Sequence, residues 1–123
     1  MPSRWEQIVV DADDPARLAR WWAEALGYQI VHEEPDEIEI RRHPDEMPGL
    51  LFTPVPEKKT VKNRLHIDLR PDDQSAEVAR LESLGAHRVS IGQGADVSWV
   101  VLADPDGNEF CVLRALTAEE LAE

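Results

Sequence analysis

The residues best suited to chemistry in this sequence lie in its second half. His66 and Arg64 belong to the alternating segment RLHIDLR, residues 64–70, and the only cysteine, Cys111, ends the segment DPDGNEFC. An imidazole can serve as a general base or hydrogen-bond donor, a guanidinium can bind a carboxylate or phosphate, and a thiolate can act as a nucleophile or metal ligand. These residue types indicate either an enzyme active site or a binding site.

The segment DPDGN, residues 104–108, has the alternating acidic start of a calcium-binding EF-hand loop. Its glycine, however, is the fourth residue rather than the sixth, and the twelfth residue is Ala115 rather than glutamate. Pro105 in the second position and Gly107 at a site that tolerates positive φ are typical of a hairpin turn. We therefore predict a turn without a calcium ion.

Cys111 has two interpretations. A nucleophilic cysteine needs a lowered pKa and a nearby base, which His66 could supply. A free cysteine within a strand is more commonly a small, buried apolar residue. We favour the second interpretation.

The apolar pattern of the first half predicts the elements that position these residues. The segment DPARLARWWAEALGY repeats apolar residues at helical spacing, with Asp14 as the N-cap and Gly27 as the stop. The predicted strands around this helix are residues 5–10, 28–34, 37–41 and 50–53.

The second half repeats this pattern. The alternation in residues 64–70 predicts a strand with Leu65, Ile67 and Leu69 on one face and the polar residues, including His66 and Asp68, on the other. The remaining predicted elements are a helix over residues 74–84, strands over 86–91, 97–102 and 110–113, and a capping box at Thr117 and Glu120 before a short terminal helix.

An internal repeat follows from this order of elements. Leu26 in LGY matches Leu84 in LGA at an offset of 84 − 26 = 58, and Asp13 matches Asp72 at an offset of 72 − 13 = 59. We therefore predict an α+β fold, with two βαβββ units over about residues 5–54 and 64–114 of a single domain, 1–123. The units are expected to form a curved mixed sheet with the helices outside.

Composition excludes several classes of function. The chain has 123 residues and a net charge of −12, which would repel nucleic acid and anionic membrane surfaces. No run approaches the roughly 18 apolar residues of a membrane helix, and the N-terminus lacks the apolar stretch of a signal peptide. A single cysteine cannot form an internal disulfide, so we expect a reducing compartment, the cytoplasm.

The paired units, the string DPDGNEF before the last strand and the single histidine in the strand that opens the second unit resemble the vicinal oxygen chelate superfamily. This superfamily includes glyoxalase I, fosfomycin and bleomycin resistance proteins and extradiol dioxygenases. The nearest resemblance is to its glyoxalase-like domain subgroup, over about residues 5–113, through DPARLARWWAEALGY, LLFTPVPEKKTVKNRLHIDL and WVVLADPDGNEFCVL. The resemblance implies a cup-shaped sheet and a homodimer, but this fold hosts many chemistries.

The resemblance also implies where a metal would bind. In the metalloenzymes of the superfamily, His and Glu side chains from the first and last strands of each unit hold a divalent metal. The matching positions are Gln7, Thr53, His66 and Cys111. Because Gln and Thr are neutral donors and no carboxylate is present, this set suits a divalent cation poorly. We expect no cofactor, with a metal held by Gln7, His66 and Cys111 as the alternative.

The first functional hypothesis is a binding protein that holds a small, partly aromatic or anionic molecule. Tryptophans around a few polar groups are typical of a pocket for a flat organic ligand. The expected ligand-binding residues are Trp5, Gln7, Thr53, Arg64, His66, Asp68, Trp99 and Cys111. Two enzymes remain as alternatives. One is a metal-assisted isomerase, lyase or dioxygenase, and the other is a metal-free enzyme with His66 as general base and Arg64 as anion clamp.

Overall fold

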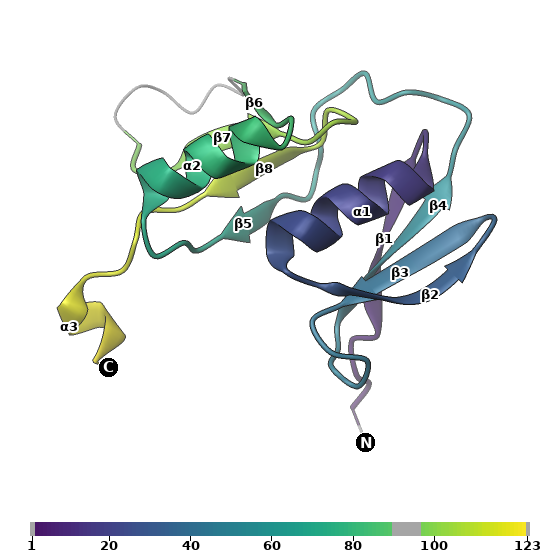
Figure 1. Ribbon diagram of the computed structural model, residues 1–123, viewed down its shortest axis with the longest axis horizontal. Helices are drawn as coiled ribbons and strands as arrows, with labels where there is room; N and C mark the ends of the chain where they lie inside the picture. Colours follow the sequence, from purple (N-terminus) through teal and green to yellow (C-terminus); the bar gives the residue numbers. More distant parts are fainter. Residues whose placement is uncertain (1, 90–96, 123) are drawn as a thin grey trace. The chain divides into compact units, whose positions relative to one another are not determined.

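The computed structural model describes residues 2–89 and 97–122. The chain divides into two compact units, Met1–Lys58 and Lys59–Glu123. In each unit a helix lies against a four-stranded sheet (Figure 1). No helix in these described ranges is long and apolar enough to cross a membrane.

The first unit is a mixed sheet with one helix. Strands β1 and β4 run parallel, and β3 pairs antiparallel with both β4 and β2, so the strand order is β1-β4-β3-β2. The parallel pair requires a crossover, which contains α1 and the β2–β3 hairpin. The elements are β1 (Gln7–Ala12), α1 (Pro15–Leu26), β2 (Gln29–Glu34), β3 (Glu37–Arg41) and β4 (Gly49–Pro54).

The second unit has the same topology. Its strand order is β5-β8-β7-β6, with β5 and β8 parallel and the other pairs antiparallel. The elements are β5 (Ile67–Leu69), α2 (Gln74–Ser83), β6 (His87–Arg88), β7 (Val100–Ala103), β8 (Glu109–Val112) and α3 (Ala118–Leu121). The predicted α+β class is therefore confirmed, as two four-stranded mixed sheets with helices.

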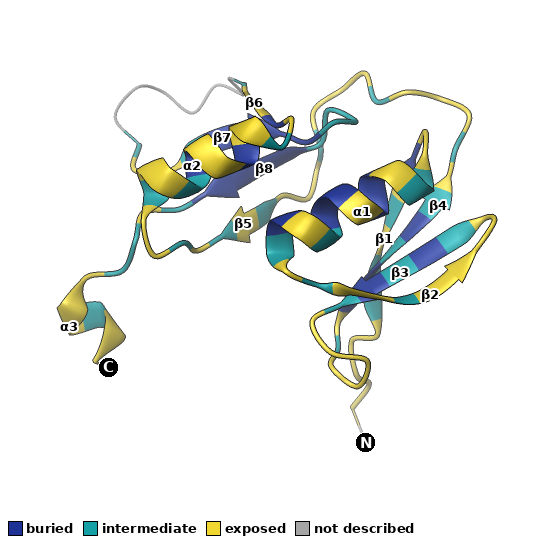
Figure 2. Cartoon of the chain, viewed as in Figure 1, coloured by how far each residue is buried: buried dark blue, intermediate teal, exposed yellow. Residues whose placement is uncertain are grey.

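Helix α1 begins and ends where its sequence predicts. The Asp14 carboxylate accepts a hydrogen bond from the Arg17 backbone N–H at 3.2 Å, which satisfies one of the unpaired donors at the N-terminus. Gly27 ends the helix with φ of 70°, a left-handed conformation that glycine adopts without strain. The apolar stripe is buried (Figure 2) and includes Leu18 and Trp22.

The second unit repeats this capping at one helix and adds a capping box at the other. Asp73 caps α2 by accepting a hydrogen bond from Ala76 N at 3.1 Å. The predicted capping box is confirmed: Thr117 Oγ1 accepts from Glu120 N, and the Glu120 carboxylate accepts from Thr117 N at 2.8 Å. The bidentate ion pair with Arg114, together with this hydrogen bond, lowers the pKa of Glu120 to about 2.

The predicted strand at residues 64–70 is wrong at its start. Strand β5 covers only Ile67–Leu69, and Leu65, predicted to share the apolar face of the strand, is 84% exposed. The reason lies in the partner strand. Strand β8 begins at Glu109, directly after the DPDGN turn, and its next residue pairs with Ile67, so residues 64 and 65 have no strand beside them.

Other strand boundaries shift for the same reason. Strand β1 begins at Gln7 rather than Trp5, because β4 begins at Gly49, the partner of Gln7. Strands β6 and β7 are also shorter than predicted, and residues 90 and 91 of the predicted strand over 86–91 lie outside the described residues.

Gly49 marks a close approach within the first sheet. Arg41 on β3 forms ion pairs with Glu39, at 2.9 Å, and with Glu6. These hydrogen bonds raise the pKa of Arg41. A Cβ atom on Gly49 would lie 2.5 Å from Glu39 Oε2 and 3.0 Å from Arg41 Cγ. The absence of a side chain at this position therefore allows the Arg41 ion pairs to form.

We predict that Gly49→Ala lowers the free energy of unfolding by about 1–3 kcal/mol, the usual cost of overpacking. Urea denaturation measures this change. The same substitution in a Glu39→Ala background should cost less, because the nearest clashing atom is absent. An unchanged midpoint for Gly49→Ala would contradict the close approach.

Candidate functional site

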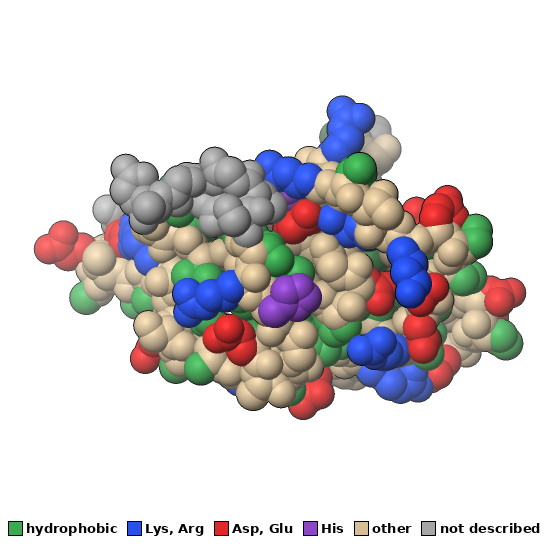
Figure 3. Space-filling view, turned by 90° about the horizontal axis from the view of Figure 1, so that it is seen from above, with side chains coloured by type: hydrophobic (Ala, Val, Ile, Leu, Met, Phe, Trp, Pro, Cys, Tyr) green, Lys and Arg blue, Asp and Glu red, His purple; other side chains and the backbone are tan. Residues whose placement is uncertain are grey.

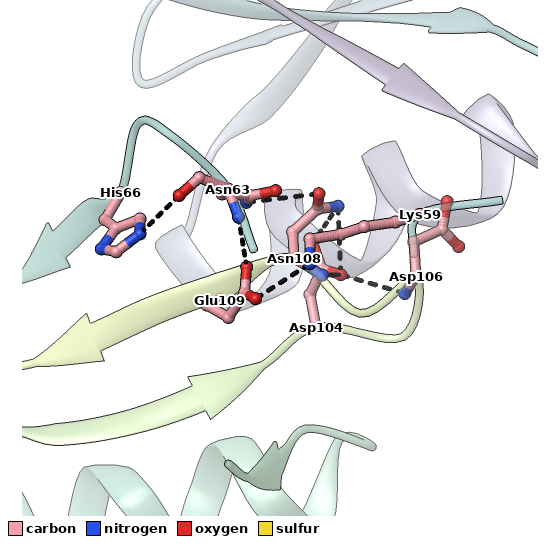
Figure 4. Close-up of polar contacts among 7 residues, drawn as sticks. All are labelled: Lys59, Asn63, His66, Asp104, Asp106, Asn108 and Glu109. Carbon is pink, nitrogen blue, oxygen red and sulfur yellow. Dashed lines mark hydrogen bonds and ion pairs between the residues drawn. The ribbon is translucent and has the colours of Figure 1, made fainter. Parts of the chain in front are cut away.

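A buried carboxylate at the start of β8 organises the polar cluster of the second unit (Figure 4). Glu109 is only 9% exposed. Its Oε1 accepts a hydrogen bond from Lys59 Nζ at 2.9 Å, and its Oε2 accepts one from the Asn63 backbone N–H at 3.1 Å. Burial alone would raise the pKa of Glu109, but the contacts with Lys59 and Asn63 outweigh it and hold the pKa below its usual value. The carboxylate is therefore ionised and paired.

The DPDGN turn contains a second buried carboxylate. Asp104 is completely buried, and its Oδ1 accepts hydrogen bonds from the backbone N–H groups of Asp106 and Asn108, both at 2.9 Å. The Asn108 amide donates to Oδ2 at 3.0 Å. Gly107, with φ of 89°, donates its N–H to the Asp104 carbonyl at 2.8 Å. The predicted turn is confirmed, and the side chain of its first residue, Asp104, stabilises it by accepting these hydrogen bonds.

The cluster extends from this turn to His66. The Asn63 amide lies 3.5 Å from Asn108 Oδ1, and the Asn63 carbonyl accepts a hydrogen bond from His66 Nε2 at 2.9 Å. A carbonyl cannot donate, so Nε2 carries a proton, and in the neutral imidazole Nδ1 therefore carries the lone pair. His66 is exposed, and its second ring nitrogen points away from Asn63 (Figure 4).

Cys111 lies beside Asp68 on the second sheet. The β5–β8 register pairs the two residues directly, so their side chains share a face. Burial raises the pKa of the Cys111 thiol, and the charge of Asp68 and a hydrogen bond to it raise the pKa further. The thiol, 7% exposed, therefore stays protonated at neutral pH, which disfavours a nucleophilic role.

In the first unit, the β1–β4 register separates Gln7 from Thr53. Gln7 pairs with Gly49 and Thr53 with Asp11. Gln7 and Thr53 are thus four residues apart along the strand pair, about 13 Å at about 3.3 Å per residue. The Thr53 hydroxyl donates to Asp11 Oδ1 at 3.2 Å. These two side chains do not meet at one point of this sheet.

The remaining candidates lie at strand ends or in the connector, residues 55–66 between β4 and β5. Trp5 precedes β1, is 63% exposed, and donates its Nε1–H to the Gln7 carbonyl at 3.2 Å. Trp99 is also exposed and precedes β7. Arg64 is exposed in the connector before β5. On the face that Figure 3 shows, Lys and Arg side chains are interspersed with acidic and hydrophobic ones.

The expected ligand set does not fit a divalent metal. It offers no carboxylate, its thiol is held protonated, and His66 Nε2 is already bonded to a backbone carbonyl. Within residues 2–89 and 97–122, the group of three metal-ligating side chains whose donor atoms lie within 4.8 Å of one another is His32, Glu34 and Glu37.

This group on the β2–β3 hairpin was not among the site residues predicted from the sequence, and neither were Glu109 and Asn63. His32 Nε2 lies 3.3 Å from Glu37 Oε1 and 3.7 Å from Glu34 Oε1, and the imidazole thus pairs with carboxylates of its own hairpin. The string HEEPDE carries the signal for the hairpin group. For Glu109 the indication in the sequence is its spacing, because it lies two residues before Cys111 and therefore on the same face of the predicted strand.

The family model of the glyoxalase-like domain matches residues 7–113. The chain belongs to this family. No curated protein matches the sequence. The fold is that of the glyoxalase, bleomycin resistance protein and dioxygenase group, so the expected membership of the vicinal oxygen chelate superfamily is confirmed.

Several solved structures share the fold of this glyoxalase-like domain. A glyoxalase/bleomycin resistance protein/dioxygenase family enzyme from Burkholderia phytofirmans PsJN has 15% identity and a TM-score of 0.70, over 93% of this chain and 100% of that one. The bleomycin resistance determinant encoded on transposon Tn5 has 21% identity and a TM-score of 0.60, over 94% and 100%. The fosfomycin resistance protein FosX from Mesorhizobium loti has 17% identity and a TM-score of 0.68, over 100% of both chains.

We predict that Asp104→Ala lowers the free energy of unfolding by about 2 kcal/mol, because it leaves the turn's N–H groups without their buried acceptor. Asp104→Asn should cost less, since one acceptor oxygen remains. Urea denaturation compares both variants with Asp72→Ala, an exposed aspartate of the same unit. Equal midpoints for Asp104→Ala and Asp72→Ala would refute the role given to the carboxylate.

A second prediction concerns thiol reactivity. Cys111 should react with iodoacetamide at pH 8 more slowly in the folded protein than in urea, because burial and Asp68 both disfavour the thiolate. Asp68→Asn removes the neighbouring charge and should speed the reaction of the folded protein. Equal rates for Asp68→Asn and the parent would show that Asp68 does not act on the thiol. Cys111→Ser should leave the fold intact.

Proposed function

We propose that this glyoxalase-like domain binds a small organic molecule without a metal, and that His66 contacts the ligand. One observation carries the proposal. His66 is exposed, its Nε2–H is committed to the Asn63 carbonyl, and its Nδ1 makes no hydrogen bond within the described part of the chain. An oriented imidazole with one available nitrogen is a ready contact for a polar group of a ligand.

The neighbouring residues support the same proposal. Asp68 lies on β5 two residues after His66 and is exposed, and Arg64 is exposed in the adjoining connector. These side chains offer both signs of charge and suit an organic molecule with several polar groups. The names of two solved neighbours refer to bleomycin resistance and fosfomycin resistance, which agrees with a small-molecule ligand.

A second candidate function is a metal-free enzyme, which the same geometry favours. The lone pair on His66 Nδ1 can accept a proton from a bound substrate, and Arg64 can hold an anionic group of that substrate. Turnover of a compound that binds separates this enzyme from a binding protein. Of the two, the binding protein needs fewer groups in fixed positions, so it is our first proposal.

We also propose a homodimer in the cytoplasm. Size-exclusion chromatography with light scattering tests the dimer, and localisation of a tagged chain in cells tests the compartment. A monomer at micromolar concentration would overturn the first of these two expectations.

A thermal-shift screen of small polar and aromatic compounds tests the proposed function. A ligand at a hundred times its Kd stabilises the folded state by about 2.7 kcal/mol, which raises the melting temperature measurably. Compounds that stabilise the parent should lose most of this effect on His66→Ala. His32→Ala, which changes an exposed histidine of the first unit, serves as the matched control.

Two results would overturn the proposed function. The first is equal stabilisation of His66→Ala and the parent by every compound that binds. The second is one metal ion per purified chain, found by elemental analysis, that disappears in His66→Ala. A metal lost only in His32→Ala would instead assign the ion to the β2–β3 hairpin.

A further inference from the structure

The cluster of Figure 4 assigns a positioning role to Glu109, a residue outside the proposed ligand contacts. We propose that the buried Glu109 carboxylate orients His66 through the peptide group of Asn63 and thereby selects the imidazole nitrogen offered to the ligand. This inference rests on the proposed function only in taking His66 as a ligand contact. The orientation itself is a property of the protein without ligand.

Burying Glu109 carries a free-energy cost. An ionised carboxylate removed from water is unfavourable unless it is paired and hydrogen-bonded. Glu109 meets this condition with partners from the connector, Lys59 and Asn63, some 46 to 50 residues earlier in the chain. The carboxylate therefore fixes where the connector passes the start of β8.

The connector has no regular structure of its own to hold it in place. Between β4 and β5 the chain forms neither helix nor strand over residues 55–66, all of which the structure describes. Regular backbone pairing thus does not fix this segment. Side-chain contacts hold it instead, including the two to Glu109 on β8, at 2.9 and 3.1 Å.

The peptide groups of Asn63 connect Glu109 to His66. Its backbone N–H donates to Glu109 Oε2 at 3.1 Å, and its backbone carbonyl accepts from His66 Nε2 at 2.9 Å. The carbonyl belongs to the residue that Glu109 anchors, so Glu109 limits where the acceptor for His66 can lie. The acceptor in turn selects the tautomer with the proton on Nε2.

This arrangement defines the chemical class of the ligand group at His66. A neutral imidazole held by Nε2–H presents a lone pair at Nδ1, so it takes a hydrogen-bond donor such as a hydroxyl or an N–H. We infer that the ligand presents such a donor to His66 rather than a carbonyl or ether oxygen alone.

Nuclear magnetic resonance of the full chain with ¹⁵N-labelled histidine rings tests the positioning role without any ligand. At about pH 8.5, where histidine side chains are ordinarily neutral, the His66 signals should show one tautomer with the proton on Nε2. The Asn63 amide should exchange slowly with solvent. The His66→Ala spectrum assigns the signals among the four histidines of the chain.

The decisive variant is Glu109→Leu, which fills the buried space and leaves Lys59 free to turn into solvent. We expect the two His66 nitrogen shifts to move toward each other and Asn63 exchange to speed up. Glu109→Gln keeps an acceptor for the Asn63 N–H and should restore much of the parent spectrum. Glu77→Gln, which breaks an ion pair with Arg80 on α2, is the control and should leave His66 unchanged.

Unchanged His66 shifts in Glu109→Leu, with core methyl signals intact, would overturn the proposal. If that variant unfolds, an Asn63 amide that exchanges without protection in the parent would overturn the proposal as well, because the hydrogen bond to Glu109 would then not hold the connector in place. The proposed function fails in a different experiment, the thermal-shift screen. It fails there if the compounds stabilise His66→Ala and the parent equally.

Discussion

Two carboxylates, Asp104 and Glu109, lie buried at the two sides of the β7–β8 turn, and the local structure of the second unit depends on how they are satisfied. Backbone and side-chain N–H groups of the turn itself surround Asp104, whereas Lys59 and Asn63 of the connector approach Glu109. Since an unpaired buried carboxylate is strongly unfavourable, the turn and the connector must both adopt these conformations for the sheet to form. The exposed imidazole of His66 is positioned as a consequence of that requirement.

The two units reach one topology through different side chains. Both helices begin at an aspartate cap, Asp14 or Asp73, and both sheets place a parallel pair of strands beside an antiparallel hairpin. Toward the start of its last strand, the first unit relies on Gly49 to admit an arginine, while the second relies on a buried glutamate. The repeat therefore preserves backbone order and not the chemistry of equivalent positions.

Much of the fold follows from the sequence because its signals are local. Helical spacing, the Asp14 cap, Gly27 and the DPDGN turn depend on neighbouring residues, and each was predicted correctly. Strand starts were missed at Trp5 and Arg64, since a strand begins where its partner begins and that partner is distant in sequence. Alternation alone could not reveal that residues 64 and 65 have no strand beside them.

The candidate site was less accessible to sequence reasoning for the same physical reason. The resemblance correctly pointed to the family. The sequence also shows directly that none of the four expected metal-ligand positions carries a carboxylate, since they hold Gln7, Thr53, His66 and Cys111. The sequence around Glu109 or Asn63 does not indicate a role for either residue, because that role arises from a contact between residues about 46 positions apart. A glutamate in a strand otherwise filled by buried residues was the only available indication.

The connector touches the rest of its unit at widely spaced points. Lys59 and Asn63 are partly buried and His66 is tied by its ring, whereas every residue between these points, 60–62 and 64–65, is exposed. Substitutions at the exposed positions alter charge and shape beside the imidazole while leaving the buried contacts in place. The connector can therefore change its exposed side chains at little thermodynamic cost while the sheet and its buried contacts stay as they are.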